Sequence, residues 1–152
     1  LLIQSPAIDE WLEVEYPEPA LLPKDELGRA KVRAIAALVG CDIHPINNKR
    51  VLEYLRGPLQ IDEQQVLTWC QHWIEEGFGA LEQLLDRDSG RGDFCVGNAP
   101  TLADVYLIPQ VESSKRFQVN LSQYPIIQNI YNACMALPEF QAAAPHNQPD
   151  AV

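Results

Sequence analysis

Apolar residues recur every three or four positions through most of this chain, which is the spacing of one face of an α-helix. This spacing predicts three long helices and two shorter ones, over 26–55, 62–85, 101–115, 125–136 and 139–143. The first is interrupted at Pro45, because proline lacks the N–H that a helix interior uses for hydrogen bonding. The alternation of apolar and polar residues that is typical of a strand does not occur after Ile3. The pattern therefore predicts a mostly α-helical fold.

The opening of the chain has a pattern of its own. The apolar run Leu1–Ile3, interpreted as the end of a strand, leads at Gln4 into a short amphipathic helix that ends at Tyr16. Ser5 is the predicted N-cap of this helix, and Pro6 suits its first position because the missing N–H is not needed there. Free backbone N–H groups at a helix start, beside a serine hydroxyl, form a candidate anion site.

The segment 17–25, with the sequence PEPALLPKD, separates this opening from the rest of the chain. It holds three of the twelve prolines in nine residues, a density that disfavours regular structure. We interpret residues 1–16 as the end of one domain, 17–25 as a linker, and 26–152 as a helical domain.

Composition and charge exclude several classes of partner. The net charge of −10 argues against nucleic acid and against an anionic membrane, since both require a basic face. No apolar run approaches the roughly 20 residues of a membrane span. The four cysteines are far apart and form no CxxC motif, which argues against a metal site or a redox pair; they are Cys41, Cys70, Cys95 and Cys134. We expect free thiols in a reducing cytoplasm.

Thr101 and Asp104 carry the sharpest local signal, a T-x-x-D capping box. In such a box the hydroxyl and the carboxylate satisfy backbone N–H groups that the first helical turn leaves unpaired. Capping boxes begin helices in every fold. This one therefore predicts only that a helix begins at Leu102.

Two groups of polar residues are candidates for chemistry. In a continuous helix, steps of three residues turn the side chain by about 300°, so His44, Asn47 and Arg50 would lie along one side and could face a common cleft. The second group is the basic pair Lys115 and Arg116 at the end of the helix predicted over 101–115. Both groups have ordinary alternatives, because helical polar residues are commonly just solvated and a basic pair at a helix C-terminus favours the helix dipole.

Four separated stretches resemble zeta-class glutathione transferases in order and spacing; they are QSPAIDEWLEVEYPEPALLPKD, CDIHPINNKRVLEYL, TLADVYLIPQV and RFQVNLSQYPII. The resemblance implies a C-terminal all-helical glutathione-transferase-like domain, preceded by the last strand and helix of a thioredoxin-like α/β domain. The earlier part of that domain, including the motif that sets the glutathione thiol in the family, is expected to be missing from the given sequence.

The resemblance also implies roles for individual residues. Gln4 and Ser5 match the pair that grips the γ-glutamyl end of glutathione, which is therefore the expected cofactor. His44 and Asn48 are expected to touch glutathione. Arg50 and Arg116 are expected to be catalytic by holding the substrate carboxylates, with Arg50 also near glutathione. Asn47 belongs to the same segment, whereas Lys115 is expected to serve the helix dipole, and no metal site is expected.

The implied function is a glutathione-dependent cis–trans isomerase that acts on maleylacetoacetate or maleylpyruvate in aromatic catabolism. The small diacid and glutathione are the expected partners, and a homodimer is the expected assembly. Two alternatives stay open. A general conjugating transferase or peroxidase of the same fold would consume glutathione, and a non-catalytic helical interaction module would fail to retain it.

Overall fold

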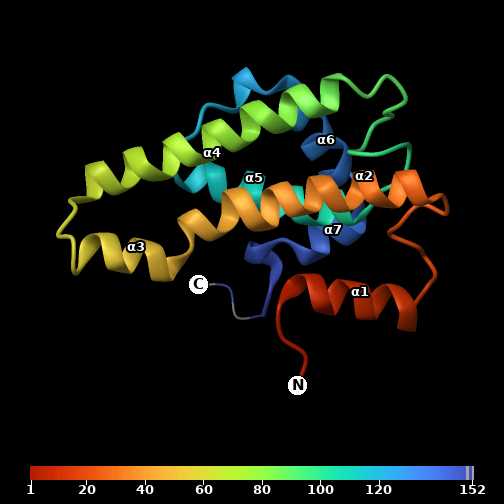
Figure 1. Ribbon diagram of the computed structural model, residues 1–152, viewed down its shortest axis with the longest axis horizontal. Coiled ribbons are helices and arrows are strands. Elements are labelled where there is room, and N and C mark those ends of the chain that lie inside the picture. Colours follow the sequence, from red (N-terminus) through yellow and green to blue (C-terminus); the bar gives the residue numbers. More distant parts are fainter. Residues whose placement is uncertain (150, 152) are drawn as a thin grey trace.

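The computed structural model describes residues 1–149 and 151 and is built from helices around a single main core (Figure 1). The α-helices are α1 (Ser5–Glu15), α2 (Glu26–Ala37), α3 (Lys49–Arg56), α4 (Glu63–Asp86), α5 (Leu102–Arg116), α6 (Pro125–Met135) and α7 (Pro138–Ala143). Short 3₁₀ turns lie at Leu121–Gln123 and Pro145–Asn147. The mostly helical prediction is confirmed, and α4, α5, α6 and α7 begin and end close to their predicted bounds. Within the described residues, none of the helices has the length and apolar character needed to cross a membrane.

The main core lies where α2, α4, α5 and α6 meet. The α5 helix packs against α2 and α6, and α4 packs against α6. Every one of these helices contributes side chains that are completely or almost completely buried; examples are Val32, Ile35, Ile74, Phe78, Leu107, Val111, Ile127 and Ile130. Their spacing of three or four residues along each helix is the pattern from which the helices were predicted.

The buried carboxylate of Asp104 organises the start of α5. It accepts hydrogen bonds from the Thr101 N–H (2.8 Å) and the Thr101 hydroxyl (2.9 Å), and from the Cys95 N–H of the preceding loop (2.9 Å). The predicted capping box is therefore confirmed, and the same carboxylate also fixes the loop that leads into the helix.

The segment after α2 differs from the prediction of one long helix over 26–55 that is interrupted at Pro45. The α2 helix continues into the π-helical segment η1 (Leu38–Ile43) and the 3₁₀ turn η2 (His44–Asn47), and the chain is extended only at Asn48, with φ −69° and ψ 150°. Pro45 is the second residue of the 3₁₀ turn, so the chain keeps helical turns past the proline instead of ending there. The break falls at Asn48 because its side chain caps the next helix, accepting from the Arg50 N–H at 3.3 Å.

A second, smaller core holds α3 in place. Leu52 and Leu55 of α3 pack with Val66 and Cys70 of α4, and Phe117 at the end of α5 packs against the same cluster. The carbonyl of Phe117 also accepts a hydrogen bond from the side chain of Gln71 on α4, at 3.0 Å. These contacts bring the beginning of α3 and the end of α5 to one region of the molecule.

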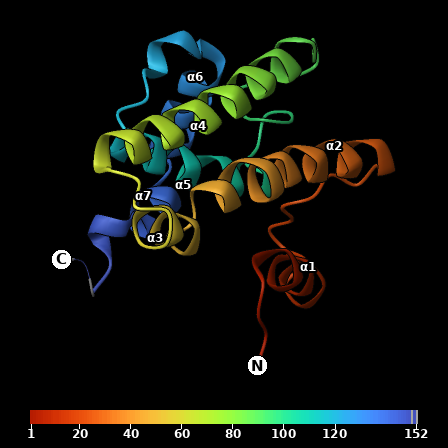
Figure 2. The same ribbon diagram turned by 60° about the vertical axis from the view of Figure 1, so that its left-hand side comes forward.

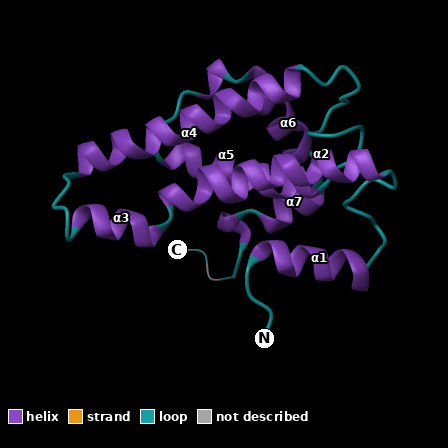
Figure 3. Ribbon diagram, viewed as in Figure 1, coloured by secondary structure: helices purple, strands orange, loops and turns teal. Residues whose placement is uncertain are grey.

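Helix α1 is set apart from the bundle, as Figure 2 shows, and none of its residues is buried. Its attachments are polar. The Glu13 carboxylate accepts from the N–H groups of Leu21 and Leu22, each at 3.1 Å, and Glu10 forms an ion pair with Arg33 of α2 at 2.7 Å. The interpreted strand at residues 1–3 is not present; the described residues contain no strand at all (Figure 3), since a strand needs a hydrogen-bonded neighbour.

Candidate functional site

The start of α1 keeps the features of an anion site, although the capping residue is not the predicted one. Gln4 precedes the helix with φ 72° and ψ 118°, and its carbonyl accepts from the N–H groups of Ala7 and Ile8, each at 3.1 Å. Ser5 is therefore the first helical residue and not the N-cap. A residue other than glycine at positive φ is strained by about 1–3 kcal/mol, and such strain clusters at binding sites.

Ser5 presents two donors at the positive end of this helix. Its side chain is exposed, and neither its N–H nor its hydroxyl has a hydrogen-bond partner among residues 1–149 and 151. Pro6, which follows it, has no N–H to compete for the same acceptor. A carboxylate can therefore accept from both donors of Ser5 at once.

A hydrogen bond from α4 fixes the segment from His44 to Arg50, and polar side chains of this segment are exposed. The indole N–H of Trp69 on α4 donates to the Ile46 carbonyl at 3.2 Å, which fixes the 3₁₀ turn. His44 and Arg50 are exposed. The side-chain oxygen of Asn48, Oδ1, caps α3, so the N–H₂ group of the same side chain is left to donate elsewhere.

The prediction that His44, Asn47 and Arg50 lie along one side of a helix is wrong. The helix is broken at Asn48, and Arg50 belongs to α3. Asn47 is half-buried, and its N–H₂ group donates to the Ile43 carbonyl at 3.5 Å. Asn47 is thus turned into the fold, whereas its two neighbours in the pattern are exposed.

The two cations at the end of α5 have different surroundings. The Lys115 ammonium group binds the Glu112 carboxylate (2.8 Å) and the Tyr131 hydroxyl (2.7 Å), and it lies 3.9 Å from the centre of the Tyr131 ring. Arg116 is exposed, and no ion pair is found for it in the described part of the chain. Lys115 is therefore engaged in packing α5 against α6, while the guanidinium group of Arg116 is available to a ligand.

Arg50 and Arg116 come from distant parts of the sequence, yet both border the smaller core. Val51, next to Arg50, and Phe117, next to Arg116, pack against the same cluster of α3 and α4 side chains. Like Arg116, Arg50 has no ion pair within residues 1–149 and 151. The backbone next to each arginine is thus anchored on the same small core.

The buried cysteines are unsuited to nucleophilic chemistry. Burial raises the pKa of Cys70 and of Cys95, and it raises the pKa of Cys134 to about 12. For Cys95 and Cys134 the nearby Asp104 carboxylate adds to the rise in pKa. Thiols with such pKa values stay protonated at neutral pH, so these three side chains are core residues.

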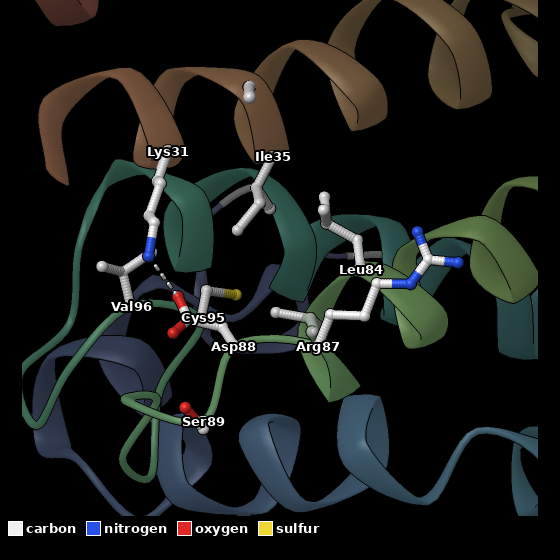
Figure 4. Close-up of a pocket in the computed structure, with 10 residues that line it drawn as sticks. Lys31, Ile35, Leu84, Arg87, Asp88, Ser89, Cys95 and Val96 are labelled. Carbon is white, nitrogen blue, oxygen red and sulfur yellow. Dashed lines mark hydrogen bonds and ion pairs between the residues drawn. The ribbon is translucent and has the colours of Figure 1, made fainter. Parts of the chain in front are cut away.

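Two cavities in the described part of the chain are lined by none of the predicted site residues. The larger, of about 290 Å³, lies between α2, the end of α4 and the loop that follows (Figure 4). Ile35, Leu84 and Val96 form apolar walls, and the ion pair between Lys31 and Asp88 (2.9 Å) spans one side. This cavity is separate from the residues that the sequence singled out.

The smaller cavity, of about 230 Å³, lies where α1 meets the bundle, and it begins at Pro6, immediately after Ser5. Tyr106 of α5 lines it, and a Cβ at Gly40 would come within 2.9 Å of the Tyr106 ring. Burial and the neighbouring Asp9 carboxylate raise the pKa of Tyr106. Tyr106 is not among the residues predicted from the sequence; the available signal was a tyrosine on an otherwise apolar helical face.

Comparison with known proteins gives a consistent result along the chain. Residues 48–138 match the family model of the glutathione S-transferase C-terminal domain. The maleylpyruvate isomerase of a Ralstonia species is 59% identical over 150 residues, covering 99% of this chain and 71% of that protein. The described helices thus correspond to most, but not all, of the length of this relative.

Solved structures agree with the sequence comparison. The holo structure of a maleyl pyruvate isomerase, a bacterial zeta-class glutathione S-transferase, is 58% identical with a TM-score of 0.98, covering 99% of this chain and 71% of that one. The maleylacetoacetate isomerase of Anaeromyxobacter dehalogenans, with GSH bound in its active site, is 46% identical with a TM-score of 0.93, covering 100% of this chain and 68% of that one. Together with the family model, these relatives show that the chain belongs to the zeta class of the glutathione S-transferase family.

Proposed function

We propose that this chain belongs to a glutathione-dependent cis–trans isomerase of maleyl-type diketo acids, with maleylpyruvate and maleylacetoacetate as the candidate substrates. The observation that carries the proposal is the pair of exposed guanidinium groups, Arg50 and Arg116. They have no ion pair among the described residues, whereas Arg33 and Arg56 are each paired with a glutamate. Arg87 is also exposed and has no ion pair there, but it lines the separate larger cavity. Relatives that match nearly the whole chain bear the names of these two isomerases.

Glutathione fits the groups that the structure offers at the start of α1. The Ser5 N–H and hydroxyl are free to bind its γ-glutamyl carboxylate, and the Gln4 amide supplies both a donor and an acceptor beside them. His44 and the free N–H₂ group of Asn48 are the further glutathione contacts in this proposal. When bound, glutathione supplies a thiolate for reversible addition to the cis double bond, which allows that bond to rotate.

The chain's own contribution to the reaction is to hold the substrate by its acid ends. Planar guanidinium groups bind carboxylates in a bidentate manner, so Arg50 and Arg116 fix the two ends of the diacid. Both groups also stabilise the negative charge that develops on the substrate. Because the chain has a net charge of −10, this local positive region selects dianions by contrast with the surrounding surface.

We also propose the domain bounds, the assembly and the compartment of this protein. Residues 1–16 are the end of the glutathione-binding domain, 17–25 the linker, and 26–152 the helical substrate-binding domain. The functional unit is a homodimer in the cytoplasm. All four cysteines are free, and three of them are buried, which suits a reducing compartment.

The test is an assay of the full-length protein with each diketo acid and a small, fixed amount of glutathione. We expect many turnovers per glutathione molecule, a trans product, and no loss of free glutathione. Accumulation of a glutathione conjugate would identify a conjugating transferase instead. Failure to bind glutathione in calorimetry would contradict the proposal and favour an interaction module. The ratio of kcat/KM for the two substrates assigns the preferred one.

A further inference from the structure

Two buried amide side chains stand out because their polar atoms lack partners. In the described residues, three buried side-chain polar atoms have no hydrogen bond: Oδ1 of Asn47, and both Nε2 and Oε1 of Gln110. Gln110 is only 2% exposed, and it lies in the middle of α5. Folded proteins pair or hydrate nearly all such groups, so an amide kept at this position indicates a partner.

The packing of α5 along α2 shows which partner is within reach. The two helices pack against each other and run in the same direction (Figures 1 and 2). One turn into α5, the Tyr106 ring lies against Gly40 of η1, the segment that continues α2. Gln110 is one further turn along the side of α5 that carries Tyr106, which brings it level with the turn after η1.

That turn contains the other amide. Asn47 ends the 3₁₀ turn η2, between His44 and Asn48, and its N–H₂ group already donates to the Ile43 carbonyl. Its Oδ1 atom is therefore left needing a donor. A glutamine amide offers two donors and an acceptor, so Gln110 can satisfy Oδ1 of Asn47 and use its own oxygen in the same network.

We propose that Gln110 is a positioning residue for glutathione binding: because no direct hydrogen bond joins the two amides, one internal water bridges the Gln110 amide to Oδ1 of Asn47, and the network holds His44 and Asn48 in their binding geometry. This inference rests on the proposed function, because it gives those two residues a glutathione contact. The network supports the turn at the place where regular helical hydrogen bonding changes from π to 3₁₀.

The first test replaces the amide with an apolar side chain of similar size, Gln110→Met, in the full-length protein. We expect KM and the dissociation constant for glutathione to rise about 3- to 10-fold, the effect of losing one hydrogen bond, while kcat at saturating glutathione changes less than about twofold. Val111→Ala is the matched control, because Val111 is fully buried in the same helix and carries no polar group. It lowers stability but should leave glutathione affinity unchanged.

The second test asks whether the two amides act together. Asn47→Leu should weaken glutathione binding to a similar extent. The affinity of the double variant for glutathione should be no lower than that of the single variant with the lower affinity, because both substitutions remove the same interaction. Gln110→Met that raises stability and leaves glutathione affinity unchanged would overturn the inference. So would fully additive effects, or an equal loss of affinity in Val111→Ala.

Glutathione binding is measured by calorimetry, separately from turnover, so the two proposals can fail separately. A protein that binds glutathione but does not isomerise diketo acids would remove the proposed function, while the affinity comparison still decides the role of Gln110. A high-resolution crystal structure provides a further check. Density for a bridging water between Asn47 and Gln110 supports the inference, and an apolar, dry separation of the two overturns it.

Discussion

Among single residues, four arginines of this chain differ in whether an ion pair holds their guanidinium group. Arg33 pairs with Glu10 across α1 and α2, and Arg56 pairs with Glu63 across the α3–α4 turn, at 2.7 and 2.6 Å. Arg50 and Arg116 are exposed, and no ion pair occupies them in the described part of the chain. A guanidinium group that is bound to a glutamate is less available to a substrate carboxylate. Arg50 and Arg116 are therefore better candidates for substrate binding than Arg33 and Arg56.

This division makes a prediction for Arg116. We expect Arg116→Ala to lower kcat/KM for the diacid by about 10-fold or more while glutathione binding stays near normal, because one charge-assisted contact to the substrate is lost. Arg116→Lys should rescue only in part, since an ammonium group cannot bind a carboxylate in a bidentate manner. Arg56→Ala, which removes a paired surface arginine, is the control and should keep full turnover. Unchanged turnover in Arg116→Ala would refute the assignment.

At the scale of elements, the π-helical segment depends on a close approach between η1 and α4. A Cβ atom added at Gly77 of α4 would overlap the side chain of Ile43, which is fully buried at the end of η1. At Gly79, two residues along α4, an added Cβ would meet nothing within 4 Å. Gly77 therefore allows the packing that places His44, whereas Gly79 has no such role.

The two glycines form a matched pair for experiment. We expect Gly77→Ala to lower the free energy of unfolding by about 1–3 kcal/mol through overpacking, and to weaken glutathione binding by displacing the turn that begins at His44. Gly79→Ala should be neutral, or stabilising by up to about 1 kcal/mol, because alanine has the higher helix propensity. Urea unfolding and calorimetry measure both effects. Equal stability of the two variants would show that Ile43 can move aside freely.

The attachment of α1 makes a prediction about pH. The Arg33 guanidinium donates to Glu10 at 2.7 and 2.9 Å, and this holds the pKa of Glu10 below its ordinary value of 4.5. A carboxyl group with a lowered pKa in the folded state stabilises the fold above its ordinary pKa, and this contribution is lost as the pH falls through the lowered pKa. Since the side chains are 41% and 49% exposed, solvent screens the pair, and we expect a contribution of only about 0.5 kcal/mol.

The measurement compares urea unfolding of the wild-type protein and Glu10→Gln at low salt. Their unfolding free energies should differ at neutral pH and converge as the pH falls below 4.5, the ordinary pKa of Glu10. Added salt should shrink the difference at neutral pH. Glu15→Gln, on the same helix, is the control and should show no such pH-dependent difference. A difference for Glu10→Gln that persists undiminished in acid would mean that the ion pair is not its cause.

At the scale of the whole molecule, exposed leucines on α2 and α4 favour the proposed homodimer. Leu27 is 68% exposed and Leu84 is 41% exposed, and both lie on the long helices that frame the larger cavity. Light scattering of the full-length protein at micromolar concentration should give the mass of a dimer. Leu84→Lys should shift it toward the monomer, because a charge would be buried in the interface. Leu59→Lys, at a leucine with 52% exposure between α3 and α4, is the control and should leave the dimer intact.

The sequence alone determined the helical character of the fold, because apolar periodicity and capping chemistry are local properties. The helix over 62–85 and the capping box at Thr101 and Asp104 were predictable for this reason, and the structure has both close to their predicted bounds. The motifs also indicated the family, which the comparisons show. Whether the named residues bind glutathione and the diacid stays a prediction.

Only the tertiary structure decided how the candidate site is assembled. The π-helical segment that continues α2 ends at Ile43, which packs over Gly77, a contact between residues far apart in the sequence. The orphaned amides of Asn47 and Gln110 became visible only when burial was known, since a sequence cannot show whether a polar atom reaches a partner. Local patterns specify helices because their hydrogen bonds are local, whereas a site depends on contacts that close only when those helices pack together.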